Sequence, residues 1–111
     1  YENGYSATKD LVESGCSFTA LFAAADVMAI GAIRALRDCG LRVPEDVSVM
    51  GFDGLPLGSY LVPQLSTVRQ SVQEMAKLSV EMLLSQINEG AKARHIFVPF
   101  TLWERESTRT I

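Results

Sequence analysis

Two carboxylates stand directly after apolar runs of strand length. Asp26 follows the run at 19–24, and Asp53 follows the run at 47–52. In open α/β sheets, ligands bind outside the carboxyl ends of the strands, so neighbouring strands would bring these two carboxylates close together. A carboxylate accepts charge-assisted hydrogen bonds from hydroxyl groups and discriminates against analogues that lack them. This chemistry suits a sugar or a related polyol.

Other roles are open for both residues. Asp26 stands between a strand and a helix, where an N-cap residue belongs, so we expect its side chain to cap that helix. No helix begins directly after Asp53, which leaves a turn residue and a ligand acceptor as equal alternatives. A sugar site also needs a flat aromatic ring; Tyr5, Phe52 and Tyr60 are candidates, with core or interface packing as the alternative.

The motifs of common enzymes are missing from the sequence. It contains no G-x-S-x-G, no phosphate-binding P-loop and no G-x-G-x-x-G after a strand. The one histidine, His95, follows a charged loop and is typical of a solvated residue. Cys16 and Cys39 are isolated, which favours buried thiols in a reducing cytoplasm over a zinc site or a disulfide. We expect no metal, no cofactor and no enzymatic activity.

Composition indicates one globular domain within 111 residues, 48% of them hydrophobic and 21% charged. No apolar run approaches the roughly 20 residues of a membrane span, and the first residues lack the pattern of a signal peptide. The net charge of −3, with scattered cations, predicts no binding to DNA by this segment alone. The start has no Met and resembles a strand-to-helix connection, which indicates a fragment.

Periodicity and turn residues place the elements. Strand, helix and strand follow one another between residues 19 and 52, which is a βαβ unit with a right-handed crossover. The sequence therefore predicts an α/β fold with a parallel sheet flanked by helices. The predicted helices are 6–13, ended by Gly15, 26–39, ended by Gly40, and one opened by a Ser71–Glu74 capping box and ended by Gly90; the predicted strands are 19–24, 47–52, 65–68 and two short edge strands around Pro99.

The helix at 26–39 has more apolar surface than one sheet can cover. Met28, Ala32 and Leu36 lie on one face, whereas Ile30 and Ile33 lie on another. We expect the first face to meet the sheet and the second to meet a partner, unless Ile30 packs inside the domain.

Three segments together resemble the C-terminal part of the effector-binding core of the LacI/GalR family of repressors. They are FTALFAAADVMAIGAIRALRDCGLRVPEDVSVMGFDG, VPQLSTVRQSVQEMAKLSVEMLLSQI and VPFTLWERESTR, and they cover nearly the whole chain. The order and spacing of G-L-x-V-P-E-D-V-S-V-x-G-F-D and L-x-T-V-x-Q are specific. The resemblance implies a partial periplasmic-binding-protein-like (type I) fold, in which residues 1–111 supply the C-terminal subdomain and the helix-turn-helix headpiece is absent.

The resemblance also implies site residues. Asp53 falls on the Asp of the family's G-[FY]-D motif, which binds effector hydroxyls in sugar-responsive members. Gln70 falls on the Gln of L-x-T-V-x-Q, and Tyr5 falls on the aromatic that often stacks on the effector near the start of this region. Ala25 stands where the family usually has an Asn that reaches the ligand, so one polar contact is missing.

Two further positions depart from the family pattern. Gly54 stands where a second Asp or an Asn is usual, and Trp103 stands where a smaller aliphatic residue is common. These departures leave the identity of the effector open.

The function implied is that of a regulatory domain. A small sugar or sugar derivative would bind and modulate operator binding by the absent headpiece of a cytoplasmic homodimer, whose interface would include Ile30, Tyr60 and Leu61. Alternatively, Tyr60 and Leu61 cover an edge of their own domain and take no part in a dimer interface. The main functional alternative is an extracytoplasmic sugar-binding protein of a transporter, which shares the fold, and a small α/β enzyme is a more distant one.

Overall fold

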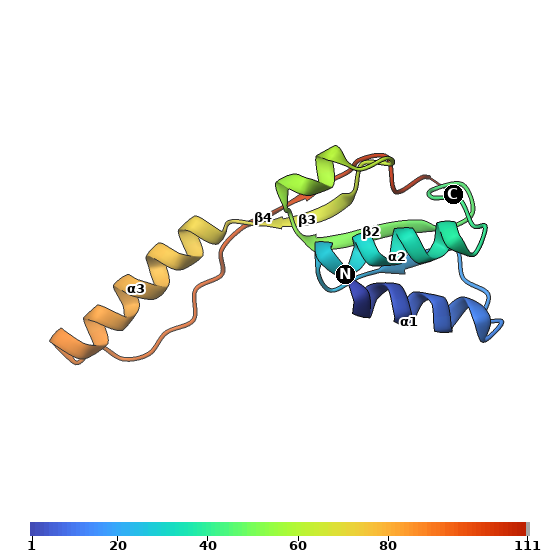
Figure 1. Ribbon diagram of the computed structural model, residues 1–111. Coiled ribbons are helices and arrows are strands. Elements are labelled where there is room, and N and C mark those ends of the chain that lie inside the picture. The colour runs from blue at the N-terminus through green and yellow to red at the C-terminus, as the bar shows by residue number, and fades with distance from the viewer. Residues whose placement is uncertain (111) are drawn as a thin grey trace. The chain divides into compact units, whose positions relative to one another are not determined.

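The computed structural model describes residues 1–110 (Figure 1). The chain divides into two compact units, one made of residues 1–69 with the segment from Thr101 onward and the other made of Gln70–Phe100. The elements in chain order are α1 (Glu2–Glu13), β1 (Ala20–Phe22), α2 (Asp26–Asp38), β2 (Ser48–Asp53), the 3-10 helix η1 (Pro56–Tyr60), β3 (Ser66–Gln70), α3 (Val72–Glu89) and β4 (Phe100–Trp103).

The strands form one sheet in the order β1-β2-β3-β4. β1 pairs with β2 in parallel, with Leu21 opposite Val49, and β2 pairs with β3 in parallel, with Phe52 opposite Val68. The predicted α/β class with a parallel sheet is therefore confirmed. Because these three strands run in the same direction, their carboxyl ends meet at one edge of the sheet.

The predicted helix ends are confirmed. Gly15, Gly40 and Gly90 follow α1, α2 and α3 with φ values of 76°, 80° and 64°, the left-handed conformation that glycine adopts without a steric penalty. α1 begins at Glu2, four residues earlier than the sequence predicted.

Two predictions near the C-terminus are wrong. Ser71 precedes α3 but makes no side-chain cap; its Oγ donates instead to the carbonyl of Pro99 at 3.0 Å. Of the two short strands expected around Pro99, the described residues form one, β4. The Ser71 hydroxyl therefore bonds to a carbonyl that is distant in the sequence and does not form a capping box with Glu74.

The core of the first unit lies between α2 and the sheet. Ala29, Ile33 and Leu36 pack from α2 against Val49 of β2 and Leu65, which precedes β3. Leu36, Val49 and Leu65 are fully buried. Leu36, from the first predicted face, therefore meets the sheet as expected, but Ile33, from the face expected to meet a partner, packs into this core as well.

Two glycines allow α1 to lie close beside α2 (Figure 1). A Cβ at Gly4 would overlap the backbone of Met28, and a Cβ at Gly31 would overlap the backbone of Tyr1. The close approach orients α1 along the helix that carries the first candidate carboxylate.

Ser107 forms hydrogen bonds with residues near the starts of both β2 and β3. Its hydroxyl donates to the Val49 carbonyl at 2.6 Å and accepts from the Ser66 amide at 2.8 Å. Its own carbonyl accepts from the Val49 amide at 2.8 Å, and its amide donates to Gln64 at 2.9 Å. Because Ser107 is fully buried, these bonds satisfy its polar groups where water cannot.

The second unit contains α3, none of whose residues is buried. Its apolar side chains Val80, Leu83 and Ile87 are 57%, 56% and 69% exposed. The second unit by itself supplies no cover for these side chains.

Replacing Leu36 by Ala should lower the free energy of unfolding by about 2–5 kcal/mol, because the change leaves a cavity between α2 and the sheet. Leu57→Ala is the matched control, since Leu57 is 44% exposed and its truncation leaves no enclosed cavity. Chemical denaturation of both variants measures the difference. Equal loss of stability in the two would contradict this placement of the core.

Candidate functional site

The carboxyl edge of the sheet brings the two predicted carboxylate segments together. Ala25 and Asp26 follow β1, and Asp53, Gly54 and Leu55 follow or end β2. Asp26 Oδ2 accepts a hydrogen bond from the Leu55 amide at 2.6 Å. The segments after the two strands therefore lie side by side, while the closeness of the two carboxylates themselves stays a prediction.

Asp26 does not cap α2, contrary to the prediction. Ala25 is the N-cap residue, with an extended backbone at φ −153° and ψ 148° and no side-chain cap bond. Asp26 is the first helical residue and is fully buried, with its second oxygen, Oδ1, accepting from Thr67 Oγ1 at 2.6 Å. The Asp26 carboxylate therefore accepts from the Leu55 amide and the Thr67 hydroxyl, and not from the amides of α2. The positive end of the α2 dipole favours its charge.

Asp53 has an unusual backbone conformation. It ends β2, is half-buried and has a φ of 128°, a region that residues with a Cβ seldom adopt. Such a conformation costs about 1–3 kcal/mol and persists where the surrounding structure imposes it, often at a binding site. Gly54 follows with φ 77°. The chain therefore turns sharply at the edge where a ligand would meet the Asp53 carboxylate.

The departure at Gly54 has a steric reason. A Cβ at this position would lie 2.6 Å from both Cβ and Cγ of Arg69, the residue opposite Asp53 in the β2–β3 register. The Arg69 guanidinium carbon lies 4.7 Å from the centre of the Trp103 ring, and that of Arg105 lies 4.6 Å from the same ring. Gly54 thus leaves room for the stem of Arg69, and Trp103 provides the ring on which the Arg69 guanidinium stacks. The sequence offered no signal for this stack, because Arg69 lies far along the chain from Trp103 and Arg105.

An aromatic pair lies near the carboxyl ends of β1 and β2. Phe22 and Phe52 meet edge to face, with ring centroids 6.4 Å apart and an interplanar angle of 81°. Phe22 is 61% exposed. Phe52 was an aromatic candidate from the sequence, whereas Phe22 was missed because its short apolar run predicted a strand and nothing more.

The structure does not bring Tyr5 to Asp53. The Tyr5 hydroxyl donates to Asp38 Oδ2 at 3.1 Å. Asp38 ends α2, twelve residues after Asp26 and therefore about 18 Å further along the helix axis. The hydrogen bond to Asp38 raises the pKa of Tyr5, and the hydrogen bond from Arg34 lowers the pKa of Asp38. The predicted stacking of Tyr5 on an effector stays a prediction.

Gln70 is the last residue of β3 and the first of the second compact unit. The residue before it, Arg69, pairs in register with Asp53. The contact of Gln70 with an effector stays a prediction.

The three residues predicted for the dimer surface gather around one groove. Ile30 from α2, Tyr60 from η1 and the following Leu61 line a groove of about 400 Å³, together with Ile33, Arg34, Arg37 and Val62. Tyr60 is 81% exposed and Val62 is 82% exposed. Arg37 Nη2 donates to the Val62 carbonyl at 2.9 Å, which holds the loop against α2. We call these seven residues the α2–η1 groove.

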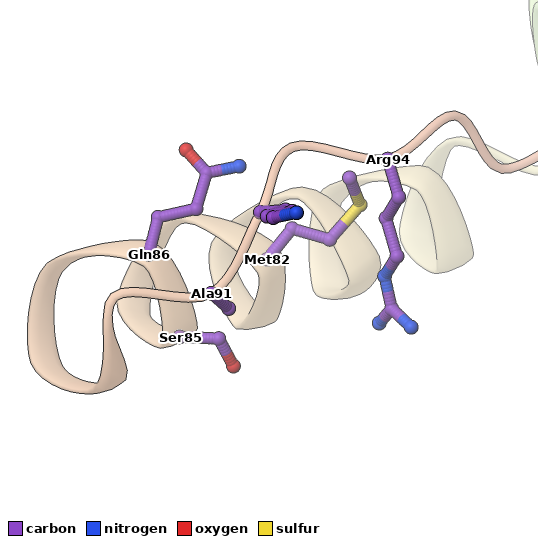
Figure 2. A pocket seen from close by; sticks show the side chains of 6 residues that line it. Met82, Ser85, Gln86, Ala91 and Arg94 are labelled. Atoms are coloured by element: carbon purple, nitrogen blue, oxygen red, sulfur yellow. The ribbon is translucent and has the colours of Figure 1, made fainter.

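A shallow pocket lies in the second unit, between the last turns of α3 and the segment that follows (Figure 2). Its volume of about 180 Å³ is below the roughly 300 Å³ at which small-molecule sites begin. The residues that line it are Met82, Ser85, Gln86, Ala91, Lys92 and Arg94. None of the predicted site residues belongs to it.

The described residues contain no group of three or more His, Cys, Asp or Glu side chains that could hold a metal ion. In the same range, no helix is both long and apolar enough to cross a membrane.

The conformation of Asp53 can be tested with two substitutions that both remove its carboxylate. Asp53→Gly should be more stable to unfolding than Asp53→Ala by roughly 1 kcal/mol, because only glycine adopts a φ of 128° without strain. This difference already includes the greater entropy of glycine in the unfolded chain. Thermal unfolding of the two proteins measures it. A more stable alanine variant would mean that Asp53 is not strained.

Residues 2–108 match the model of the periplasmic binding protein-like domain. The chain is 40% identical over 109 residues to the HTH-type transcriptional regulator MalR of Clostridium butyricum, which covers 96% of this chain and 32% of the regulator. The chain thus spans about a third of the length of the curated relatives that it matches.

Solved structures agree. The lac repressor dimer bound to operator and the anti-inducer ONPF has a TM-score of 0.89 at 34% identity, covering 96% of this chain and 37% of that one. A LacI family transcriptional regulator from Enterococcus faecium with bound ribose has a TM-score of 0.82 at 31% identity, covering 96% and 40%. The resemblance predicted from the motifs is confirmed. The chain belongs to the periplasmic binding protein-like domain family, in the form found in LacI-type transcriptional regulators.

Proposed function

We propose that residues 1–111 are the C-terminal part of the effector-binding core of a LacI/GalR-type transcriptional regulator. A sugar or sugar derivative binds at the carboxyl edge of the sheet and modulates operator binding by a headpiece outside these residues. Mechanistically, the effector shifts the regulator between two arrangements only to the extent that it binds one of them more tightly. Operator binding changes with that shift.

One observation carries the proposal. Asp53 occupies the family's effector motif, lies at the carboxyl edge and has the strained backbone expected of a residue that function keeps in place. A carboxylate there accepts two hydroxyl hydrogen bonds with charge assistance. Ala25 at the same edge provides no polar side chain, and Gln70 is the second polar residue that we assign to the effector.

The relatives favour a regulator over the alternatives. MalR and the ribose operon repressor are named as transcriptional regulators, whereas a transporter's sugar-binding protein shares only the fold. We therefore assign the chain to a cytoplasmic regulator, and to a binding role without catalysis.

We assign the α2–η1 groove to a homodimer interface. It is mainly apolar, is lined by Arg34 and Arg37, and includes the strongly exposed Tyr60. Aromatic and arginine side chains are the residues that contribute most at protein interfaces. The lac repressor, a similar structure, was solved as a dimer.

The effector role of Asp53 predicts a loss of sugar affinity in the complete gene product. Ribose and other mono- and disaccharides are first screened by thermal shift. For a sugar that stabilises the protein, Asp53→Asn should weaken binding by about 1–3 kcal/mol, since the hydrogen bonds lose their charge. Titration calorimetry measures the affinity.

Asp10→Asn is the matched control, because Asp10 is an exposed carboxylate on α1. Unchanged affinity in Asp53→Asn would remove this residue from the site. A panel in which no sugar stabilises the protein would contradict a sugar effector.

The interface predicts that a charge in the groove separates the dimer. Ile30→Glu and Tyr60→Glu should each shift the complete protein toward monomer, because removing a carboxylate from water in this mainly apolar interface costs more than its attraction to Arg34 and Arg37 returns. Tyr60 is so exposed that its replacement leaves the fold intact. Sedimentation velocity measures the state, with Leu11→Glu on α1 as control. A persistent dimer in both variants would rule out this interface.

A further inference from the structure

We propose that Asp26 is a positioning residue for effector recognition, which acts together with Thr67 and does not touch the ligand. The pair holds the backbone that follows Asp53, and thereby sets the direction in which the Asp53 carboxylate is presented. This inference rests on the proposed function of Asp53.

Three hydrogen bonds connect the pair to the Asp53 loop. Asp26 Oδ2 accepts from the Leu55 amide at 2.6 Å, and Asp26 Oδ1 accepts from the Thr67 hydroxyl at 2.6 Å. The Thr67 oxygen in turn accepts from the Gly54 amide at 3.3 Å. Both amides that follow Asp53 are therefore bound, one directly by the buried carboxylate and one through the hydroxyl.

The network is suited to a carboxylate at position 26. Both of its oxygens accept, one from the Leu55 amide and one from the Thr67 hydroxyl. An amide there could accept from only one of the two donors, and its N–H group would oblige the Thr67 oxygen to accept instead of donating. Asp26 and Thr67 are both fully buried, so water cannot replace a lost bond. Gly51 completes the site, because a Cβ there would overlap Asp26 Oδ1.

The network explains how the unusual conformation of Asp53 persists. A residue with a Cβ relaxes from a φ of 128° unless its neighbours are held. Here the next two amides are held by groups on α2 and β3, two elements of the packed core. If the bonds are removed, the loop gains freedom, and the Asp53 carboxylate spends less time in the direction that meets a ligand.

Thr67→Val in the complete gene product tests the inference, because valine keeps the shape of threonine and removes the hydroxyl. Amide hydrogen exchange in peptides covering residues 53–57 should become about tenfold faster, and ribose, the probe sugar, should bind about tenfold more weakly. Thr67→Ser keeps the hydroxyl and should restore both values.

Ser66→Ala is the matched control, since Ser66 is an equally buried hydroxyl on the same strand whose contacts are Thr108 and the Arg105 amide. It should lower the melting temperature by a similar amount and leave exchange at 53–57 unchanged. This comparison separates loop positioning from a general loss of stability.

The inference is overturned if Thr67→Val exchanges no faster at 53–57 than Ser66→Ala. It is also overturned if ribose affinity depends on Asp53 but not on Thr67. Failure of the proposed function has a different signature, namely that no sugar of the panel stabilises the unchanged protein, or that sugar binding survives Asp53→Asn. In that case, amide exchange at residues 53–57 in Thr67→Val and Ser66→Ala still tests whether Asp26 and Thr67 restrain the loop after Asp53.

Discussion

The buried carboxylate of Asp26 joins three parts of the sheet that the sequence keeps far apart. It stands at the first turn of α2, accepts from the amide of Leu55 after β2 and accepts from the hydroxyl of Thr67 on β3. A buried charge is costly unless it is fully hydrogen-bonded, so the carboxyl edge has to keep these donors in place. The geometry of the candidate site follows from that constraint, because Asp53 lies immediately before the residues that are held.

α2 supports both candidate surfaces. Its first residue, Asp26, faces the loop after β2, while Ile30, just over one turn later, lines the α2–η1 groove. The remaining face packs through Leu36 and Ile33 into the core. This division explains why the helix is apolar on more than one side. Its amphipathic pattern reflects a sheet on one face and an exposed groove on another.

Two of the three departures from the family pattern, Gly54 and Trp103, are connected in three dimensions. Gly54 leaves room for the stem of Arg69, whose guanidinium stacks on Trp103 together with that of Arg105. A second polar side chain after Asp53 would overlap that stem. The loss of this polar residue and the gain of a large aromatic are therefore linked by packing, although they lie far apart in the sequence.

The sequence by itself determined the features that depend on local chemistry. The glycine at the end of each helix and the apolar runs of the parallel strands are short-range signals that predicted most of the fold, and the motif around Asp53 is a short-range signal that points to the candidate site. Tertiary structure decided which partner each polar side chain takes. Asp26 and Ser71 had plausible local roles as helix caps, but donors or acceptors 28 to 41 residues away bind them instead. The physical reason is that a buried polar group binds whatever the fold brings within reach, and that choice is not encoded by its neighbours along the chain.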